Sequence, residues 1–187
     1  MESQLIYFIL IVLIIVTAIN LKLTLRLLKI INSPPVDVNN QLPVDIGEKL
    51  PIVMGRSLNK KIEEKVSGDG VPAVLVFLSS KCPVCREKVP EIESIYTKSG
   101  DAGLTLRLIT KESKSRIRHF FSDSKLLKAL LVVSNKSYKT LNPTQASPYY
   151  LFIDHERRLQ ACGIIGDENW QSFVDQINNV ELVEART

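Results

Sequence analysis

The chain is poor in cysteine and histidine, with three and two of them in 187 residues. Three cysteines are too few for a small scaffold held together by disulfides. Dense stripes of lysine and arginine are also missing and the net charge is only +4, so the charge pattern does not favour nucleic-acid binding. The sequence contains no internal repeat. With 45% hydrophobic and 24% charged residues, the composition excludes a disordered or collagen-like protein and supplies enough apolar material for one core.

The most apolar part of the chain is its N-terminal segment. From Leu5 to Leu25 the residues are mostly apolar, which gives the roughly 20 residues that a helix needs to cross a bilayer. A cleaved signal peptide is the alternative, with residues 16–18 as a small-residue cleavage site. However, a signal peptide requires positive charge before its apolar run, and this chain has none there. We therefore expect residues 1–31 to form an uncleaved, single-pass membrane anchor in contact with the lipid bilayer.

Prolines and asparagines gather after this segment, so residues 32–46 are interpreted as an extended linker. Residues 47–187 then form one domain, long enough for a single core. Its patterns alternate between strand and helix. The strands are expected over residues 71–78, 104–109, 129–133, 149–153 and 159–164, and the helices over 57–66, from Cys82 onward, over 115–121 and after Asp167. This order predicts an α/β domain with a mixed central sheet.

The sequence Cys82-Pro83-Val84-Cys85 lies where a buried strand leads into a helix. A thiolate at a helix N-terminus is stabilised by unpaired backbone N–H groups and by the positive end of the helix dipole. Cys82 is therefore expected to be the exposed nucleophile. Cys85, one turn further on the apolar stripe, is expected to be the shielded resolving thiol. Such a pair can exchange between dithiol and disulfide through a mixed disulfide on Cys82.

The two cysteines have three other interpretations. A zinc site needs two more ligands, and only His119, His155 and Cys162 are available, scattered over separate elements. A copper-delivery module usually has three residues between its cysteines and adds a distant histidine. The third alternative is a purely structural disulfide. Redox exchange is favoured, because a Cys-x-x-Cys between strand and helix is a specific signal. Cys162 itself is expected to be a packed core thiol.

Two stretches carry a resemblance to the thioredoxin superfamily. They are residues 74–85, VLVFLSSKCPVC, and residues 147–154, SPYYLFID, and they are accompanied by Pro90, Gly47 and Pro51. The chain most closely resembles membrane-anchored thioredoxin-like proteins of the methylamine-utilisation accessory type (MauD-like) and the related cytochrome-maturation thioredoxins. The likeness covers about residues 44–180 and implies a thioredoxin-like fold.

By this resemblance, Pro148 would be a cis-proline beside Cys82, and the backbone of Ser147 would pair with a substrate strand. The alternative is that Pro148 is an ordinary boundary between loop and strand. The sequence also departs from the family pattern, since Val76 stands where many thioredoxins have a buried acid and Lys81 where they have an aromatic residue. The proton acceptor for Cys85 would then be missing, which favours narrow specificity over general thioredoxin activity.

Together these features predict a membrane-tethered thiol–disulfide oxidoreductase that acts on protein clients through transient mixed disulfides. No metal or organic cofactor and no nucleic-acid partner is implied. The alternatives are a tethered, redox-inactive binding module or chaperone, and a zinc- or copper-binding protein of thioredoxin-like fold. Lys22, Arg26 and Lys29 follow the apolar run, and this charge bias alone would keep the domain in the cytoplasm. Because disulfides persist outside the cytoplasm, we nevertheless expect the domain on the extracytoplasmic side.

Overall fold

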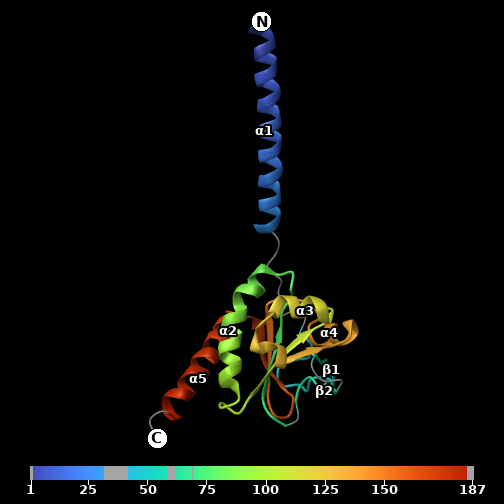
Figure 1. Ribbon diagram of the computed structural model, residues 1–187, viewed down its shortest axis with the longest axis vertical. Coiled ribbons are helices and arrows are strands. Elements are labelled where there is room, and N and C mark those ends of the chain that lie inside the picture. The colour runs from blue at the N-terminus through green and yellow to red at the C-terminus, as the bar shows by residue number, and fades with distance from the viewer. Residues whose placement is uncertain (1, 32–41, 59–61, 69, 185–187) are drawn as a thin grey trace. The chain divides into compact units, whose positions relative to one another are not determined.

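The computed structural model describes residues 2–31, 42–58, 62–68 and 70–184 (Figure 1). The chain divides into two units, Met1–Asp37 and Val38–Thr187. The first ten residues of the predicted linker, 32–41, lie outside the described residues.

The first unit contains a single long helix, α1 (Glu2–Ile31). Its side chains are described without a gap from Leu10 to Leu25, and every large hydrophobic side chain in that stretch is exposed. The hydroxyl of Thr17 donates to the carbonyl oxygen of Leu13 at 2.9 Å, so this polar group is satisfied within the helix. Within the part of the chain that the structure describes, no helix combines the length and hydropathy needed to cross a membrane. The expected anchor is thus helical as predicted, but its membrane crossing is not supported.

The second unit is built around one mixed sheet with the strand order β2-β1-β5-β4-β3-β6-β7. The strands are β1 (Met54–Ser57), β2 (Glu63–Lys65), β3 (Ala73–Phe77), β4 (Thr105–Thr110), β5 (Leu130–Val132), β6 (Tyr149–Ile153) and β7 (Leu159–Ile164). The helices are α2 (Pro83–Ser99), α3 (Lys114–Phe121), the 3₁₀ helix η2 (Lys125–Lys128), α4 (Asn135–Leu141) and α5 (Glu168–Glu184). β4 runs parallel to β3 and β5, and the other pairs are antiparallel. The predicted α/β class with a mixed central sheet is confirmed.

The central strand β3 is buried on both faces, because all five of its side chains are enclosed. One face packs against α2, α3 and α5, and the other packs against α4 and the segment that precedes β1. Helices α2 and α5 lie side by side (Figure 1). The indole N–H of Trp170 on α5 donates to Glu91 on α2 at 2.6 Å. This packing holds α2, and therefore the cysteines at its N-terminus, firmly on the sheet.

The helix predicted over residues 57–66 is wrong. Ser57 ends β1, and residues 63–65 form β2, which pairs with β1 in antiparallel fashion. Residues 59–61 lie outside the described part. The helical spacing of Leu58, Ile62 and Val66 does not reflect one buried face. Leu58 and Val66 pack into different clusters and Ile62 is 59% exposed. Short apolar patterns of this kind do not separate helix from strand.

Candidate active site

Cys82 and Cys85 lie on the first turn of α2, as the sequence predicts. Cys82 is the N-cap residue, and its sulfur accepts the backbone N–H of Cys85 at 3.3 Å. Pro83 follows at the start of the helix, where its missing N–H costs no hydrogen bond. Cys82 is partly exposed, Cys85 is fully buried, and both thiols are free. One sulfur is therefore accessible to a partner while the other lies behind it.

The buried environment of Cys85 strongly favours its protonated form. Burial, together with the neighbouring Cys82, raises the pKa of the Cys85 thiol from 9.0 to about 12. Two groups oppose this shift and lower the pKa, the backbone N–H of Ser79 and the side chain of Ser147. The Ser79 N–H lies 3.5 Å from the Cys85 sulfur. A Cys85 thiolate is therefore stabilised above all by the Ser79 N–H, which bonds its sulfur directly.

The segment before β6 lies directly against the exposed thiol. The thiol of Cys82 donates to the carbonyl oxygen of Ser147 at 3.6 Å. The Ser147–Pro148 peptide is cis, as the resemblance implies, and Pro148 is buried. Ser147 thus contacts Cys82 through its backbone and influences Cys85 through its side chain. The structure brings together all four residues that the sequence singled out.

A carboxylate near the thiol pair was not anticipated from the sequence. Glu112 accepts the backbone N–H of Ser80 at 2.9 Å and also accepts its hydroxyl. Glu112 comes just after the parallel strand β4, and Ser80 comes just after β3. The carboxyl ends of adjacent parallel strands meet at one edge of the sheet, where functional groups of α/β proteins tend to gather. That placement is the signal that could have identified Glu112.

A cavity of about 200 Å³ adjoins this site. Its lining includes Ser79, Glu112 and Ser147, together with Tyr138 of α4 and Lys111. The ammonium group of Lys111 lies 4.9 Å from the centre of the Tyr138 ring. Burial raises the pKa of Tyr138 to about 12, so its hydroxyl stays neutral at physiological pH. Neither cysteine lines the cavity, but Ser79 and Ser147, whose backbones contact the two cysteine sulfurs, do.

Cys162 lies away from the pair, on β7 opposite Leu151 of β6. It is partly buried and packs against the cluster on the α4 face of the sheet. Burial raises the pKa of Cys162, and a hydrogen bond with Tyr149 opposes that rise. Among the described residues, no group of three or more His, Cys, Asp or Glu side chains could hold a metal ion.

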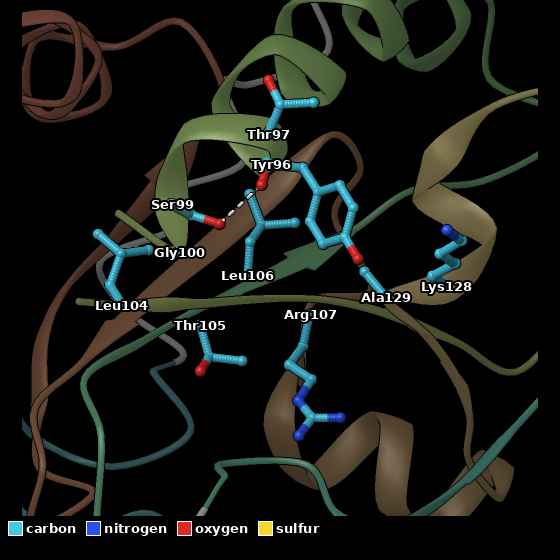
Figure 2. Close-up of a pocket in the computed structure, with 10 residues that line it drawn as sticks. All are labelled: Tyr96, Thr97, Ser99, Gly100, Leu104, Thr105, Leu106, Arg107, Lys128 and Ala129. Atoms are coloured by element: carbon cyan, nitrogen blue, oxygen red, sulfur yellow. Dashed lines mark hydrogen bonds between the residues drawn. The ribbon is translucent and has the colours of Figure 1, made fainter. Parts of the chain in front are cut away.

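A larger cavity of about 450 Å³ lies at the opposite end of α2. Figure 2 shows Tyr96, Ser99 and Gly100 of that end beside the first residues of β4. The Ser99 hydroxyl donates to the Tyr96 carbonyl oxygen at 2.9 Å (Figure 2). No thiol or carboxylate lines this cavity. It is therefore separate from the cysteine site, which lies at the N-terminal end of the same helix.

No family model and no curated protein sequence matches the chain. Solved structures do resemble it. The thioredoxin domain of a thiol-disulfide oxidoreductase from Bacteroides vulgatus is 16% identical with a TM-score of 0.60, and the match covers 72% of this chain and 99% of that one. The fold of this chain is thioredoxin-like. A thiol:disulfide interchange protein from Bacteroides sp. is also 16% identical, with a TM-score of 0.59 and coverage of 73% and 93%. A secreted Mycobacterium tuberculosis disulfide oxidoreductase homologous to E. coli DsbE is 16% identical, with a TM-score of 0.53 and coverage of 67% and 94%.

These structures support the predicted thioredoxin-like fold. The finer resemblance to MauD-like and cytochrome-maturation thioredoxins stays a prediction, as do the roles of Cys82, Cys85, Ser147 and Pro148.

Proposed function

We propose that this protein is a thiol–disulfide oxidoreductase that uses Cys82 and Cys85. The observation that carries the proposal is the arrangement of two free thiols on one helical turn, with Cys82 accessible at the N-cap and Cys85 buried behind it. The N-cap position offers a thiolate the free N–H groups of the first turn. The similar solved structures support the proposal, since they are described as thiol-disulfide oxidoreductases and interchange proteins.

The exchange proceeds in two substitutions at sulfur. The Cys82 thiolate attacks a client disulfide, forms a mixed disulfide with one client sulfur and releases the other as a thiolate. The Cys85 thiolate then attacks the Cys82 sulfur and releases the first client sulfur. The client gains two electrons while the protein forms the Cys82–Cys85 disulfide. The reverse sequence oxidises a client dithiol and leaves the protein reduced.

Titration in dithiothreitol buffers of graded potential tests this proposal. The full chain should gain and lose one Cys82–Cys85 disulfide reversibly, as detected by mass after alkylation of the remaining thiols. Cys82→Ser and Cys85→Ser should each abolish the transition, while Cys162→Ser should leave its midpoint unchanged. A wild-type pair that stays reduced at every potential would leave the redox-inactive binding module as the better interpretation.

We further propose that α1 tethers the domain to a membrane. The support is the length of the apolar segment Leu5–Leu25 and the exposure of its described hydrophobic side chains, for example Leu13 at 61% and Leu21 at 61%. A contiguous apolar surface of this kind is unusual in water unless it meets a lipid or protein partner. In cells, the full chain should stay in the membrane pellet after an alkaline carbonate wash. Recovery in the wash supernatant would contradict the tether.

The proposed location of the domain is extracytoplasmic, because disulfide exchange is most useful where disulfides persist. The support is the accessible Cys82 thiol and the secreted disulfide oxidoreductase among the similar structures. A membrane-impermeant maleimide should label reduced Cys82 on intact cells, with Cys82→Ser as the control for the signal. Labelling that appears only after lysis would place the domain in the cytoplasm, as the charges of Lys22, Arg26 and Lys29 would favour.

A further inference from the structure

The turn that leads into the cysteine motif is fixed by a residue from another strand. Glu112 follows β4, and its side chain is only 13% exposed. It accepts two hydrogen bonds from Ser80, one from the backbone N–H at 2.9 Å and one from the hydroxyl. Its own backbone N–H is bonded to the Thr110 hydroxyl at 3.1 Å. Thr110 thus holds the backbone of Glu112, and the turn holds its carboxylate.

The same turn contacts both cysteines. Its closing hydrogen bond runs from the backbone N–H of Cys82 to the carbonyl oxygen of Ser79 at 3.1 Å. The N–H of Ser79 points the other way, to the sulfur of Cys85 at 3.5 Å. Both contacts are made by the backbone of Ser79, and Ser80, which Glu112 holds, is the next residue in the chain. A shift of the turn would therefore move the donor on which a Cys85 thiolate depends.

We propose that Glu112 is a positioning residue for the resolving thiol. Its two hydrogen bonds to Ser80 keep the Ser79 N–H directed at Cys85, and so set the rate at which Cys85 attacks the mixed disulfide on Cys82. The proposal rests on the proposed function, because it assigns a role within the second substitution. It goes beyond that function in naming a residue outside the motif that controls one of its two steps.

The physical basis is hydrogen bonding, so charge is not required. A glutamine in place of Glu112 can accept the Ser80 N–H through its carbonyl oxygen and donate to the Ser80 hydroxyl through its amide. Glu112→Gln therefore removes the charge and keeps both bonds, whereas Glu112→Ala removes both bonds. Arg116 lies 3.9 Å from the carboxylate and its side chain is 53% exposed. An exposed pair at this distance contributes little to holding the carboxylate.

Reaction with the chromogenic disulfide 5,5′-dithiobis(2-nitrobenzoate) separates the two steps. Cys82 attacks it and releases one thionitrobenzoate, and Cys85 then attacks the Cys82 sulfur and releases the second. The full chain with Cys162→Ser is used throughout, so that no third thiol reacts. Glu112→Ala should slow the second release by about tenfold, move its pH profile to higher pH and leave the first release within about twofold. Glu112→Gln should keep both releases within about twofold of the parent.

Glu93 provides a matched control. Its carboxylate on α2 accepts the backbone N–H of Lys125 at 2.8 Å, so it also ties one element to another, but it does not contact the cysteine turn. Glu93→Ala should leave both releases and the pH profile unchanged. If Glu112→Ala does not fold, Ser80→Ala, which removes one of the two bonds, should still slow the second release selectively.

The proposal would be overturned if Glu112→Ala released the second thionitrobenzoate at the parent's rate. The same holds for Ser80→Ala if Glu112→Ala does not fold. Equal slowing in Glu112→Gln would also overturn it, since charge would then be the cause. These results differ from a failure of the proposed function, in which the Cys162→Ser parent itself would not release a second thionitrobenzoate.

Discussion

The thiol of Cys82 donates to the carbonyl oxygen of Ser147 at 3.6 Å, although 65 positions separate the two residues in the chain. The contact joins the N-cap of α2 to the segment that enters β6. A client sulfur bonded to Cys82 would therefore lie alongside the backbone of Ser147. Cys85 lies behind Cys82 and is fully buried, so a client approaching from that backbone reaches one sulfur only.

This difference in access predicts different behaviour of the two single-cysteine variants. Cys85→Ser should accumulate covalent adducts with client proteins in cells, because Cys82 can attack but no thiol completes the exchange. Cys82→Ser should accumulate none, because the remaining thiol of the pair, Cys85, is buried. Non-reducing electrophoresis after acid quenching, with and without dithiothreitol, measures both.

Cys162→Ser is the control for that experiment, since Cys162 lies on β7 away from the pair. Combined with Cys85→Ser it should leave the adduct pattern unchanged. Adducts that form on Cys82→Ser in place of Cys85→Ser would reverse the roles assigned to the nucleophile and the resolving thiol.

Ser147→Ala should affect the second step of exchange more than the first. The Ser147 side chain lowers the pKa of Cys85, so its loss should reduce the thiolate fraction of Cys85 and slow resolution by about 2- to 10-fold. The carbonyl oxygen that contacts Cys82 is retained in the variant. The two releases of thionitrobenzoate report the two steps. Thr144→Ala, in the same loop but bonded to Asn142, is the control, and equal slowing there would refute a specific effect of Ser147.

Much of the architecture could be predicted from local patterns. The continuous apolar run of β3 and the hairpin of β6 and β7 carry strong signals, because buried strands need unbroken or alternating apolar residues. Helix α4 was missed, since only Tyr138 and Leu141 of its seven residues are buried and the rest is polar. Such a short, weakly amphipathic segment has no clear periodicity in the sequence.

The candidate site likewise has one part that the sequence predicts and one part that depends on how distant strands pair. The Cys-Pro-Val-Cys motif could be placed from the sequence because its residues are neighbours in one helical turn. For Glu112 the sequence shows only its place just after a strand, since its contact with Ser80 spans 32 residues and exists only because β3 and β4 pair in parallel in one register. Pairing of that kind depends on the packing of the whole sheet and has no local signature.

Asp167 is expected to stabilise the fold through two bonds. It caps α5 by accepting the backbone N–H of Trp170 at 2.8 Å, and it accepts the hydroxyl of buried Tyr150 at 2.9 Å. Asp167→Ala should lower the free energy of unfolding by about 1–3 kcal/mol, as urea denaturation can measure. Asp175→Ala, at an exposed position of the same helix, should change it by less than about 0.5 kcal/mol. Equal losses in both variants would contradict the assigned role.

The raised pKa of Cys85 predicts how the stability of the reduced protein depends on pH. The thiol has an ordinary pKa of 9.0, and burial raises the pKa to about 12 in the folded protein. Between these values the unfolded chain has lost the proton while the folded chain still holds it. The stabilisation is therefore complete below about pH 9 and is lost as the pH rises toward 12.

Cys85→Ser isolates this contribution, because buried Tyr138, whose pKa is also raised by burial to about 12, titrates in both proteins. Under reducing conditions, the free energy of unfolding should fall more steeply between pH 9 and 12 in the wild type than in Cys85→Ser. The difference between the two curves should be flat below pH 9, where the thiol is protonated in both the folded and the unfolded state. Parallel curves over the whole range would mean that the folded protein does not hold the Cys85 proton more tightly than the unfolded chain does. The resolving thiol would then need no help from Ser79 or Ser147 to become a thiolate.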